Sequence, residues 1–307
     1  MTRMHTLTWN DFPQGFTPFF LDPTGADLEI KELSKGVYAL LSTIPNVDNT
    51  GFVVGENGVL VVDSHINIAM ANLIQKRIRE VTDKPLLYLV NSNYHGDHTF
   101  GNCAFKKDVQ LIQHKITSEL IEYFEEEKEF LFPCVGNKTE IYEGIVLRRP
   151  DIVFDNFLEI NLGGITVELH YFGQANTPGD TITYVPSAKC AWTGNMTGGN
   201  LIITLESTPS TYLESLRTFS KSLDVETLIP AHNPISHSNI LDKYILYLNQ
   251  LIDSVEKDKK DSKSLDEITN STPLLLNQTY SPPSDHPRIT FFEELHSFNV
   301  RRAYDST

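Results

Sequence analysis

The alternation of apolar and polar residues predicts a series of short strands between residues 37 and 229. The first three are Val37 to Ser42, Thr50 to Gly55 and Gly58 to Asp63, with Glu56-Asn57-Gly58 as a hairpin turn. Further strands are predicted at 86–90, at 109–113, within 152–169 around a Gly163-Gly164 turn, at 181–185, at 190–193 and at 227–229. These strands are interrupted by segments of helical periodicity, so the pattern predicts an α/β protein.

Helical spacing of apolar residues predicts the intervening and the C-terminal elements. Asn67 to Val81 has Met70, Leu73, Ile74 and Ile78 on one face, as an amphipathic helix requires. Other helices are predicted at 116–130, 211–223, 239–256 and 291–304. The last two flank a charged linker at 257–263, a capping box at Ser264 and Glu267, and a loop at 281–287. The final helix either shapes a substrate pocket or packs on the outside of the domain, and we favour the outside.

These patterns divide the chain into three parts. Residues 1–30 are rich in Phe, Pro and Asp and are predicted to form an irregular N-terminal arm. Residues 31–238 contain the predicted strands and form the main domain. Residues 239–307 form a C-terminal helical extension.

Composition limits the classes of function. The chain has 307 residues, 40% of them hydrophobic, which is enough for a real core. Its net charge is −15, which argues against binding to nucleic acid. Acidic tracts such as 125–129 are predicted to be solvated helix faces rather than binding sites. Composition leaves the oligomeric state open.

Cysteine usage and hydropathy indicate the compartment. The three cysteines have no Cys-x-x-Cys spacing, so no disulfide framework is expected. No stretch approaches the length of about 18 apolar residues that a membrane-spanning helix needs. The N-terminus also lacks the apolar region of a signal peptide. A cytoplasmic location is the expectation.

Candidate chemistry is concentrated directly after the apolar run 86–90. The segment Asn91-Ser92-Asn93-Tyr94-His95-Gly96-Asp97-His98 contains two imidazoles and a carboxylate within four residues. A strand that ends in a tight loop would turn such side chains toward one point. Imidazole nitrogen and carboxylate oxygen are ligands that zinc prefers. The segment therefore predicts a metal site.

This segment resembles the H-x-H-x-D-H motif of the metallo-β-lactamase fold superfamily. Four other segments resemble the family's remaining motifs in the same order; they are 55–63, which ends in Asp63, 173–180 (Gly-Gln-Ala-Asn-Thr-Pro-Gly-Asp), 192–195 (Trp-Thr-Gly-Asn) and 229–232 (Ile-Pro-Ala-His). The resemblance implies a four-layer αββα sandwich for residues 31–238. It also implies a cleft in which all these motifs meet.

The chain departs from the family at several ligand positions. The family's first metal site corresponds to Asn93, His95 and Asn176, so two of its three ligands are amides here. The second site corresponds to Asp97, His98, Asn195 and His232, of which only the bridging residue Asn195 is an amide. An amide oxygen is a weaker zinc ligand than imidazole or carboxylate. The positions that keep a metal-binding side chain are His95, Asp97, His98 and His232.

The surviving ligands imply a mononuclear metal centre. We expect one zinc ion (Zn²⁺) rather than two, held by Asp97, His98 and His232, with iron or manganese as the alternatives. The resemblance then implies a hydrolase with a small-molecule substrate that is an ester, thioester, lactone or lactam. Asp97 would orient or deprotonate the attacking water. His95 would act as general acid or base, because its own metal site is broken.

Two other functions compete with this hydrolase. The loss of ligands is also compatible with a metal-poor pseudoenzyme that has a binding or regulatory role. Redox chemistry at a di-iron centre is a third alternative, but the loss of the bridging acid at Asn195 argues against it.

Several polar residues near the motifs are expected to have supporting roles. Asp63 is predicted to orient a residue of the metal loop by hydrogen bonding. His65 is predicted to be a loop residue near the active face, and His170 a structural histidine. Asp180 is predicted to fix its own loop rather than bind metal.

Overall fold

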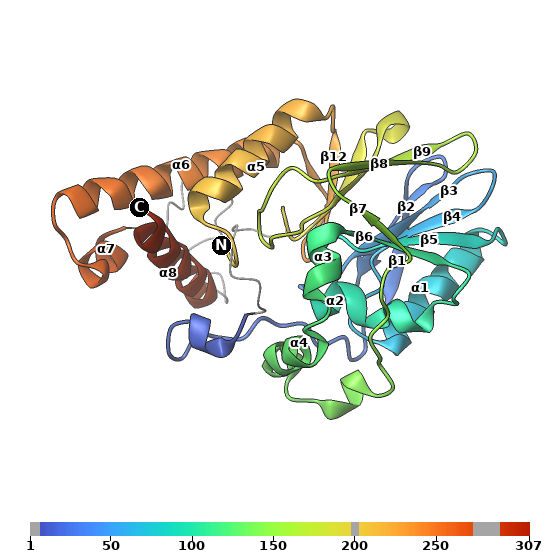
Figure 1. Ribbon diagram of the computed structural model, residues 1–307, viewed down its shortest axis with the longest axis horizontal. Coiled ribbons are helices and arrows are strands. Elements are labelled where there is room, and N and C mark those ends of the chain that lie inside the picture. Colours follow the sequence, from blue (N-terminus) through green and yellow to red (C-terminus); the bar gives the residue numbers. More distant parts are fainter. Residues whose placement is uncertain (1–6, 198–202, 273–288) are drawn as a thin grey trace.

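The computed structural model describes residues 7–197, 203–272 and 289–307, and its strands form two facing sheets (Figure 1). The loop predicted at 281–287 lies outside the described residues. The first sheet has the order β1 to β7, with β1 (Leu28–Ser34), β2 (Val37–Ser42), β3 (Thr50–Val54), β4 (Val59–Val62), β5 (Leu86–Val90), β6 (Gln110–His114) and β7 (Ile152–Phe154). The second has the order β13-β12-β11-β10-β9-β8, with β8 (Phe157–Asn161), β9 (Thr166–His170), β10 (Ile182–Val185), β11 (Cys190–Gly194), β12 (Thr227–Pro230) and β13 (Ser236–His237).

Strand direction brings the motif loops to one edge of each sheet. In the first sheet β1 to β4 are antiparallel, and β4 to β7 are parallel to one another. The loops after β4 and β5 therefore leave the same edge. In the second sheet β11 and β12 are parallel, so the motifs that follow them also lie together.

Three apolar layers hold the sandwich together. Between the sheets, residues such as Val53, Leu60 and Trp192 are buried side by side. Helix α1 (Ile68–Val81) covers the outer face of the first sheet, where Ile74 and Ile78 are fully buried. Helix α5 (Pro209–Ser222) covers the second sheet through residues that include Leu216 and Phe219. The expected α/β four-layer sandwich is thus confirmed.

Local sequence signals explain where the helices begin. The Asn67 side chain accepts a hydrogen bond of 2.9 Å from the backbone N–H of Met70, which caps α1. Thr208 caps α5 in the same way, with Pro209 in the first turn. The capping box at Ser264 and Glu267 is present and starts helix α7 (Leu265–Ser271).

The C-terminal helices pack on α5 and on the N-terminal arm. Helices α6 (Asn239–Lys260) and α8 (Ile289–Ser306) share an apolar cluster with α5, and Figure 1 shows them at the side of the molecule away from α1. In the arm, the ring of Phe12 stacks on Phe298 of α8 with centroids 5.1 Å apart. The arm also holds the 3-10 helix Trp9–Asp11. Among the described residues, no helix is both long and apolar enough to cross a membrane.

Three boundaries differ clearly from the prediction. Helix α6 continues to Lys260, so the first four residues of the linker predicted at 257–263 are helical. Strand β1 begins at Leu28, inside the segment expected to be irregular, because it pairs along its length with β2. The single helix predicted at 116–130 is two helices, α3 (Lys115–Leu120) and α4 (Phe124–Leu131). Leu120 packs beside Tyr94, whereas Phe130 packs against the rings of Trp9 and Phe12 in the N-terminal arm. Each half therefore buries its apolar side in a different place, and one straight helix cannot do both. The short helix α2 (Gly96–Thr99) and 3-10 helices at 100–104, 133–135, 139–142 and 186–188 complete the fold.

Candidate metal centre

The loop after β5 is closed by a buried amide. The Asn91 Nδ2 donates to the backbone oxygen of His98 at 3.0 Å, and Asn91 Oδ1 accepts from Gln113 and Asn102, each at 2.8 Å. These hydrogen bonds fold residues 91–98 back on the end of β5. Asp97 and His98 are thereby held in the first turn of α2, facing the second sheet.

Four side chains meet in front of this loop. Asp48, Asp97, His98 and His232 each offer a ligand atom, and these atoms all lie within 4.8 Å of one another. His98 Nε2 is 3.7 Å from Asp97 Oδ2 and 4.0 Å from Asp48 Oδ1. His232 Nε2 is 3.4 Å from the same Asp97 oxygen. Asp97, His98 and His232 therefore converge as the motif order predicts, and Asp48 joins them from the loop between β2 and β3.

Buried ligand atoms without hydrogen bonds make this group a candidate metal site. Both carboxylate oxygens of Asp48, Oδ1 of Asp97 and Nε2 of His98 are buried and have no hydrogen-bond partner among the described residues. Leaving such atoms unpaired is costly unless something else binds them. Two imidazole nitrogens and two carboxylates are a donor set that suits zinc. The residues present thus fit the metal that the family resemblance implies.

Asp63 fixes the orientation of His98. Its Oδ2 lies 3.0 Å from His98 Nδ1, and its two oxygens also accept hydrogen bonds of 2.7 Å from the N–H and the hydroxyl of Ser92. With Nδ1 held in this way, Nε2 points into the four-residue group. Asp63 itself has φ of +59°, a left-handed conformation that Asp tolerates better than most residues.

Asn49 joins the two sheets beside the site. Its backbone N–H donates to Ala231 O at 2.6 Å, and its side-chain amide donates to Pro230 O at 3.0 Å and Asn233 O at 2.8 Å. Asp48 and His232 flank these contacts. These two candidate ligands, which come from opposite halves of the sandwich, are therefore positioned by protein hydrogen bonds.

His95 belongs to a second cluster and is not one of the four grouped residues. Its Nδ1 is 2.8 Å from Glu127 Oε1, and its Nε2 is 3.5 Å from Glu206 Oε1. The same Glu127 oxygen accepts from the Gly96 N–H at 3.1 Å. Glu127 is 2% exposed, so the expectation of a solvated acidic face at 125–129 is wrong at this residue. The helix break before α4 turns Glu127 toward the loop.

Two of the three amide positions contact residues of this second cluster. Asn93 Oδ1 accepts from the His95 N–H at 2.9 Å. Asn176 donates to Ile203 O at 3.0 Å, and its backbone oxygen accepts from the Glu206 N–H at 3.1 Å. The side-chain oxygens of Asn176 and Asn195 are buried and lack a partner among the described residues. They add polarity without adding negative charge.

Each cluster raises the pKa of one buried histidine. Burial alone lowers the pKa of His98, but the nearby carboxylates of Asp97 and Asp63 outweigh it and raise the pKa to about 10. His95 behaves similarly, since Glu127 overcomes burial and raises its pKa to about 9. Burial raises the pKa of Glu206 to about 8. Burial opposes the shift of Asp97, yet the surrounding histidines lower the pKa of this carboxyl.

Three functional candidates escaped the sequence analysis: Asp48, Glu127 and Glu206. Asp48 stands in a polar connection between two strands, where an acidic residue attracts no notice. Glu127 is hidden in an acidic run, and Glu206 precedes a helix without any motif. Helical spacing offered one signal: Glu127 shares a helix face with Phe124 and Phe130, three residues away on either side.

The supporting residues lie where they were expected to act. His65 is buried beside the site, and burial lowers its pKa to about 3. The Nε2 atom of His170 is 2.8 Å from Glu168, and its ring stacks on Phe172, which is a structural role. Asp180 accepts hydrogen bonds from the N–H and hydroxyl of Thr177, at 2.8 and 3.0 Å, and so fixes its own loop.

Comparisons with solved structures find the same fold in other proteins. A metallo-β-lactamase from Pontibacter korlensis aligns with a TM-score of 0.59 at 15% identity, covering 73% of this chain and 99% of that one. A metallo-β-lactamase from Erythrobacter litoralis gives a TM-score of 0.56 at 17% identity over 73% of this chain and 97% of that one. An inverting sec-alkylsulfatase from Pseudomonas sp. gives a TM-score of 0.66 at 13% identity. The alignment covers 91% of this chain and 50% of the sulfatase. At these identities the likeness shows a shared fold.

The family itself follows from the sequence. The model of the metallo-beta-lactamase superfamily matches residues 44–232, which is more than half of the 307 residues and includes every motif loop of the site. This chain therefore belongs to the metallo-β-lactamase superfamily.

Proposed function

We propose that this protein is a hydrolase that depends on a single metal ion and cleaves an ester, thioester, lactone or lactam. The observation that carries the proposal is the set of four converging ligand atoms from Asp48, Asp97, His98 and His232, within 4.8 Å of one another. Burial of their unpaired donor atoms supports a metal rather than a network of hydrogen bonds. Zinc is the expected metal.

The residues in and around the four-residue group have separate roles in the proposed hydrolysis. When bound, a divalent metal ion supplies Lewis acidity, which lowers the pKa of water and stabilises negative charge on a carbonyl oxygen. Asp97 orients the attacking water and accepts its proton. His95 is fixed at Nδ1 by Glu127, so Nε2 is the atom that exchanges a proton with the substrate. Asp63 keeps Nε2 of His98 directed at the metal position.

The amides at Asn93, Asn176 and Asn195 support one metal ion rather than two. The first family site has only His95 left, and that imidazole is engaged with two carboxylates. At the second site Asp48 supplies a carboxylate, which compensates in charge for the amide at Asn195. These replacements support the proposal of a mononuclear centre.

Elemental analysis of protein purified without chelator tests the proposal. One equivalent of metal per chain is expected. Asp97→Ala should remove the metal more completely than His95→Ala, because only Asp97 belongs to the four-residue group. Asp180→Ala removes a buried carboxylate outside that group and is the matched control.

Activity on a chromogenic ester, a thioester, a γ-lactone and a β-lactam would identify the reacting bond. A chain that binds no metal and cleaves none of these would contradict the proposal. It would instead favour a pseudoenzyme with a binding or regulatory role. Equal metal loss in the Asp97→Ala and His95→Ala variants would show that the ligands are assigned wrongly.

A further inference from the structure

Helix α8 is joined by hydrogen bonds to the segment before α5, which carries Glu206. Arg302 donates from Nε to Thr204 O at 3.3 Å and from Nη2 to Ser207 O at 3.0 Å. The Asn299 side-chain oxygen accepts from the N–H and the hydroxyl of Thr204, at 2.9 and 3.0 Å. Two side chains of one helix thus hold the chain on both sides of Glu206.

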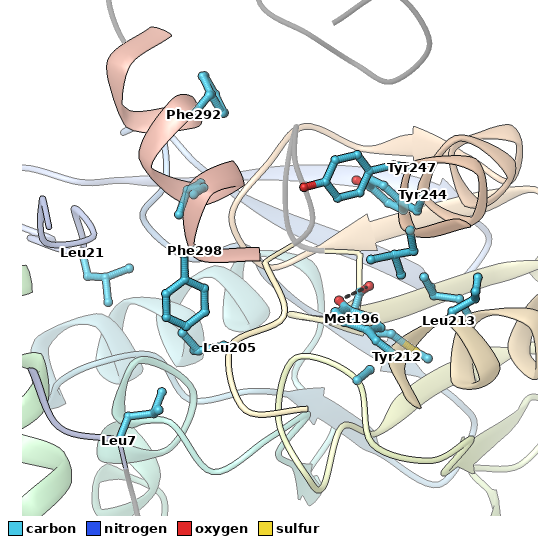
Figure 2. Packing of buried hydrophobic residues seen from close by; sticks show 14 of the residues in the cluster. Leu7, Leu21, Met196, Leu205, Tyr212, Leu213, Tyr244, Tyr247, Phe292 and Phe298 are labelled. Atoms are coloured by element: carbon cyan, nitrogen blue, oxygen red, sulfur yellow. Dashed lines mark hydrogen bonds between the residues drawn. The ribbon is translucent and has the colours of Figure 1, made fainter. Parts of the chain in front are cut away.

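The side of α8 that makes these contacts is itself held by buried groups. The Asn299 Nδ2 donates to the hydroxyl of Tyr247 on α6 at 2.9 Å, and His296 Nδ1 lies 2.9 Å from the same hydroxyl. Asn299 is fully buried and His296 is 3% exposed. Figure 2 shows Phe298 pointing from α8 toward Leu205, which adds an apolar contact to the polar ones. Buried networks of this kind favour one arrangement of their members.

The same segment is also attached to the motif loop at 173–180. The Glu206 N–H donates to Asn176 O at 3.1 Å, and the Asn176 side-chain amide donates to Ile203 O at 3.0 Å. Segment 203–207 therefore lies between the C-terminal extension and the candidate site, with hydrogen bonds to both.

The side chain of Glu206 reaches from this segment to His95. It is 7% exposed, and its Oε1 lies 3.5 Å from Nε2 of His95. Glu127 Oε1 lies 2.8 Å from Nδ1 of the same ring. The ring is thus placed between two carboxylates, one from α4 and one from the segment that α8 holds.

We propose that Glu206 is a positioning residue for His95, and that α8 places it there through Arg302 and Asn299. The inference rests on the proposed function, in which Nε2 of His95 exchanges a proton with the substrate. Reacting groups must be held closely in place, and a shift of about 1 Å can cost about 100-fold in rate. The C-terminal extension then belongs to the proposed active site, in addition to covering the domain.

The first expected result concerns turnover of whichever substrate the parent cleaves. Arg302→Met removes both donors to the segment and should lower kcat by up to about 100-fold. Glu206→Gln keeps the size of the side chain but removes its charge, and kcat should fall in the same way. KM and zinc affinity should stay near the parent values, because neither residue belongs to the four-residue group.

The position of His95 can also be measured without any reaction. In the chelated full chain, proton–nitrogen correlation spectra report the ring nitrogens of each histidine, and His95→Gln and His98→Gln identify the two signals. Arg302→Met and Glu206→Gln should shift the His95 signals and leave those of His98 in place. Arg301→Met is the matched control, since it is the same substitution one residue earlier on α8, at an arginine that pairs with α7.

A second variant separates position from charge. Asn299→Ser shortens the other contact to Thr204 without changing the charge of the protein, and it should shift the His95 signals in the same direction as Arg302→Met. Should one of these two variants lose its native circular dichroism, the other provides the test.

The two measurements distinguish failure of this inference from failure of the hydrolase proposal. If the parent cleaves no substrate, the hydrolase proposal fails, and the histidine signals alone decide whether α8 places Glu206 against His95. Unchanged His95 signals in the α8 variants would overturn the inference. Shifted signals with an unchanged kcat would overturn it as well, as would a loss of kcat in Arg301→Met equal to that in Arg302→Met.

Discussion

Asp63→Asn should weaken metal binding although Asp63 is not a ligand. The carboxylate contacts His98 Nδ1 at 3.0 Å and the N–H and hydroxyl of Ser92 at 2.7 Å each. Asn tolerates the positive φ at this position, so the backbone should not change. Its oxygen can still accept from the Ser92 N–H. The side-chain NH2 group of the new Asn would then face His98 Nδ1. An NH2 group cannot accept a hydrogen bond from an N–H at that position.

The consequence is a change of tautomer in His98. The proton moves to Nε2, the atom that must offer a lone pair to the metal. Loss of such an outer partner typically weakens metal affinity by about 10- to 100-fold, or roughly 1.4 to 2.8 kcal/mol. The metal-free variant should also lose about 1.5–3 kcal/mol of stability, as for other hydrogen bonds to charged groups.

Competition with a chromophoric zinc chelator measures the affinity, and urea unfolding of the chelated protein measures the stability. Asp180→Asn is the control, since it also converts a buried carboxylate into an amide but contacts Thr177 instead of a histidine. An unchanged zinc affinity in Asp63→Asn would refute the tautomer argument. Equal weakening by Asp180→Asn would refute it as well, because that loss could not arise from His98.

Three further predictions concern the number of metal ions and the titration of the site. Restoring the family ligands should raise the metal content toward two ions per chain, measured by elemental analysis of the triple variant Asn93→His, Asn176→His and Asn195→Asp; a folded triple variant with the parent's metal content would contradict this. Zinc binding at pH 7.5 should release protons, because His98, with a pKa raised to about 10, must lose one to bind; calorimetry in buffers of different ionisation enthalpy measures the number, and none is the contrary result. Metal-free protein should lose stability as the pH rises from about 7 to 10, since the pKa values of His95 and His98 are raised on folding to about 9 and 10 and the folded state then binds more protons. A urea midpoint that rises between pH 7 and 10 would show that the pKa values of His95 and His98 are not raised on folding.

The sequence was informative wherever local pattern and order along the chain decide the structure. The strands at 37–63 and 86–90 alternate or run apolar, and the loop 91–98 follows directly, so its place at a sheet edge was predictable. Asp97, His98 and His232 belong to motifs with fixed spacing. Their convergence follows from the fold that the motifs imply.

Other members of the site depend on contacts that local pattern does not encode. Asp48 reaches the centre because Asn49 attaches its loop to the other sheet, across more than 180 residues of sequence. Glu127 turns inward only because α3 and α4 pack against different clusters. Strand β1 was missed because its pairing with β2, rather than its own composition, makes Leu28 to Ser34 a strand. Tertiary packing overrides the local pattern at each of these positions.

The hydrogen bonds of Asn49 affect how the protein opens as well as where its ligands lie. Because they join the loop before β3 to the end of β12, the halves of the sandwich cannot separate at this edge without breaking all three. The backbone N–H of Asn49 should therefore exchange with solvent deuterium only through large-scale unfolding, even without metal. The candidate ligands are then held in place before a metal ion binds, so binding requires little rearrangement of the protein. Slow exchange at Asn49 in chelated protein would be the signature of a preformed site.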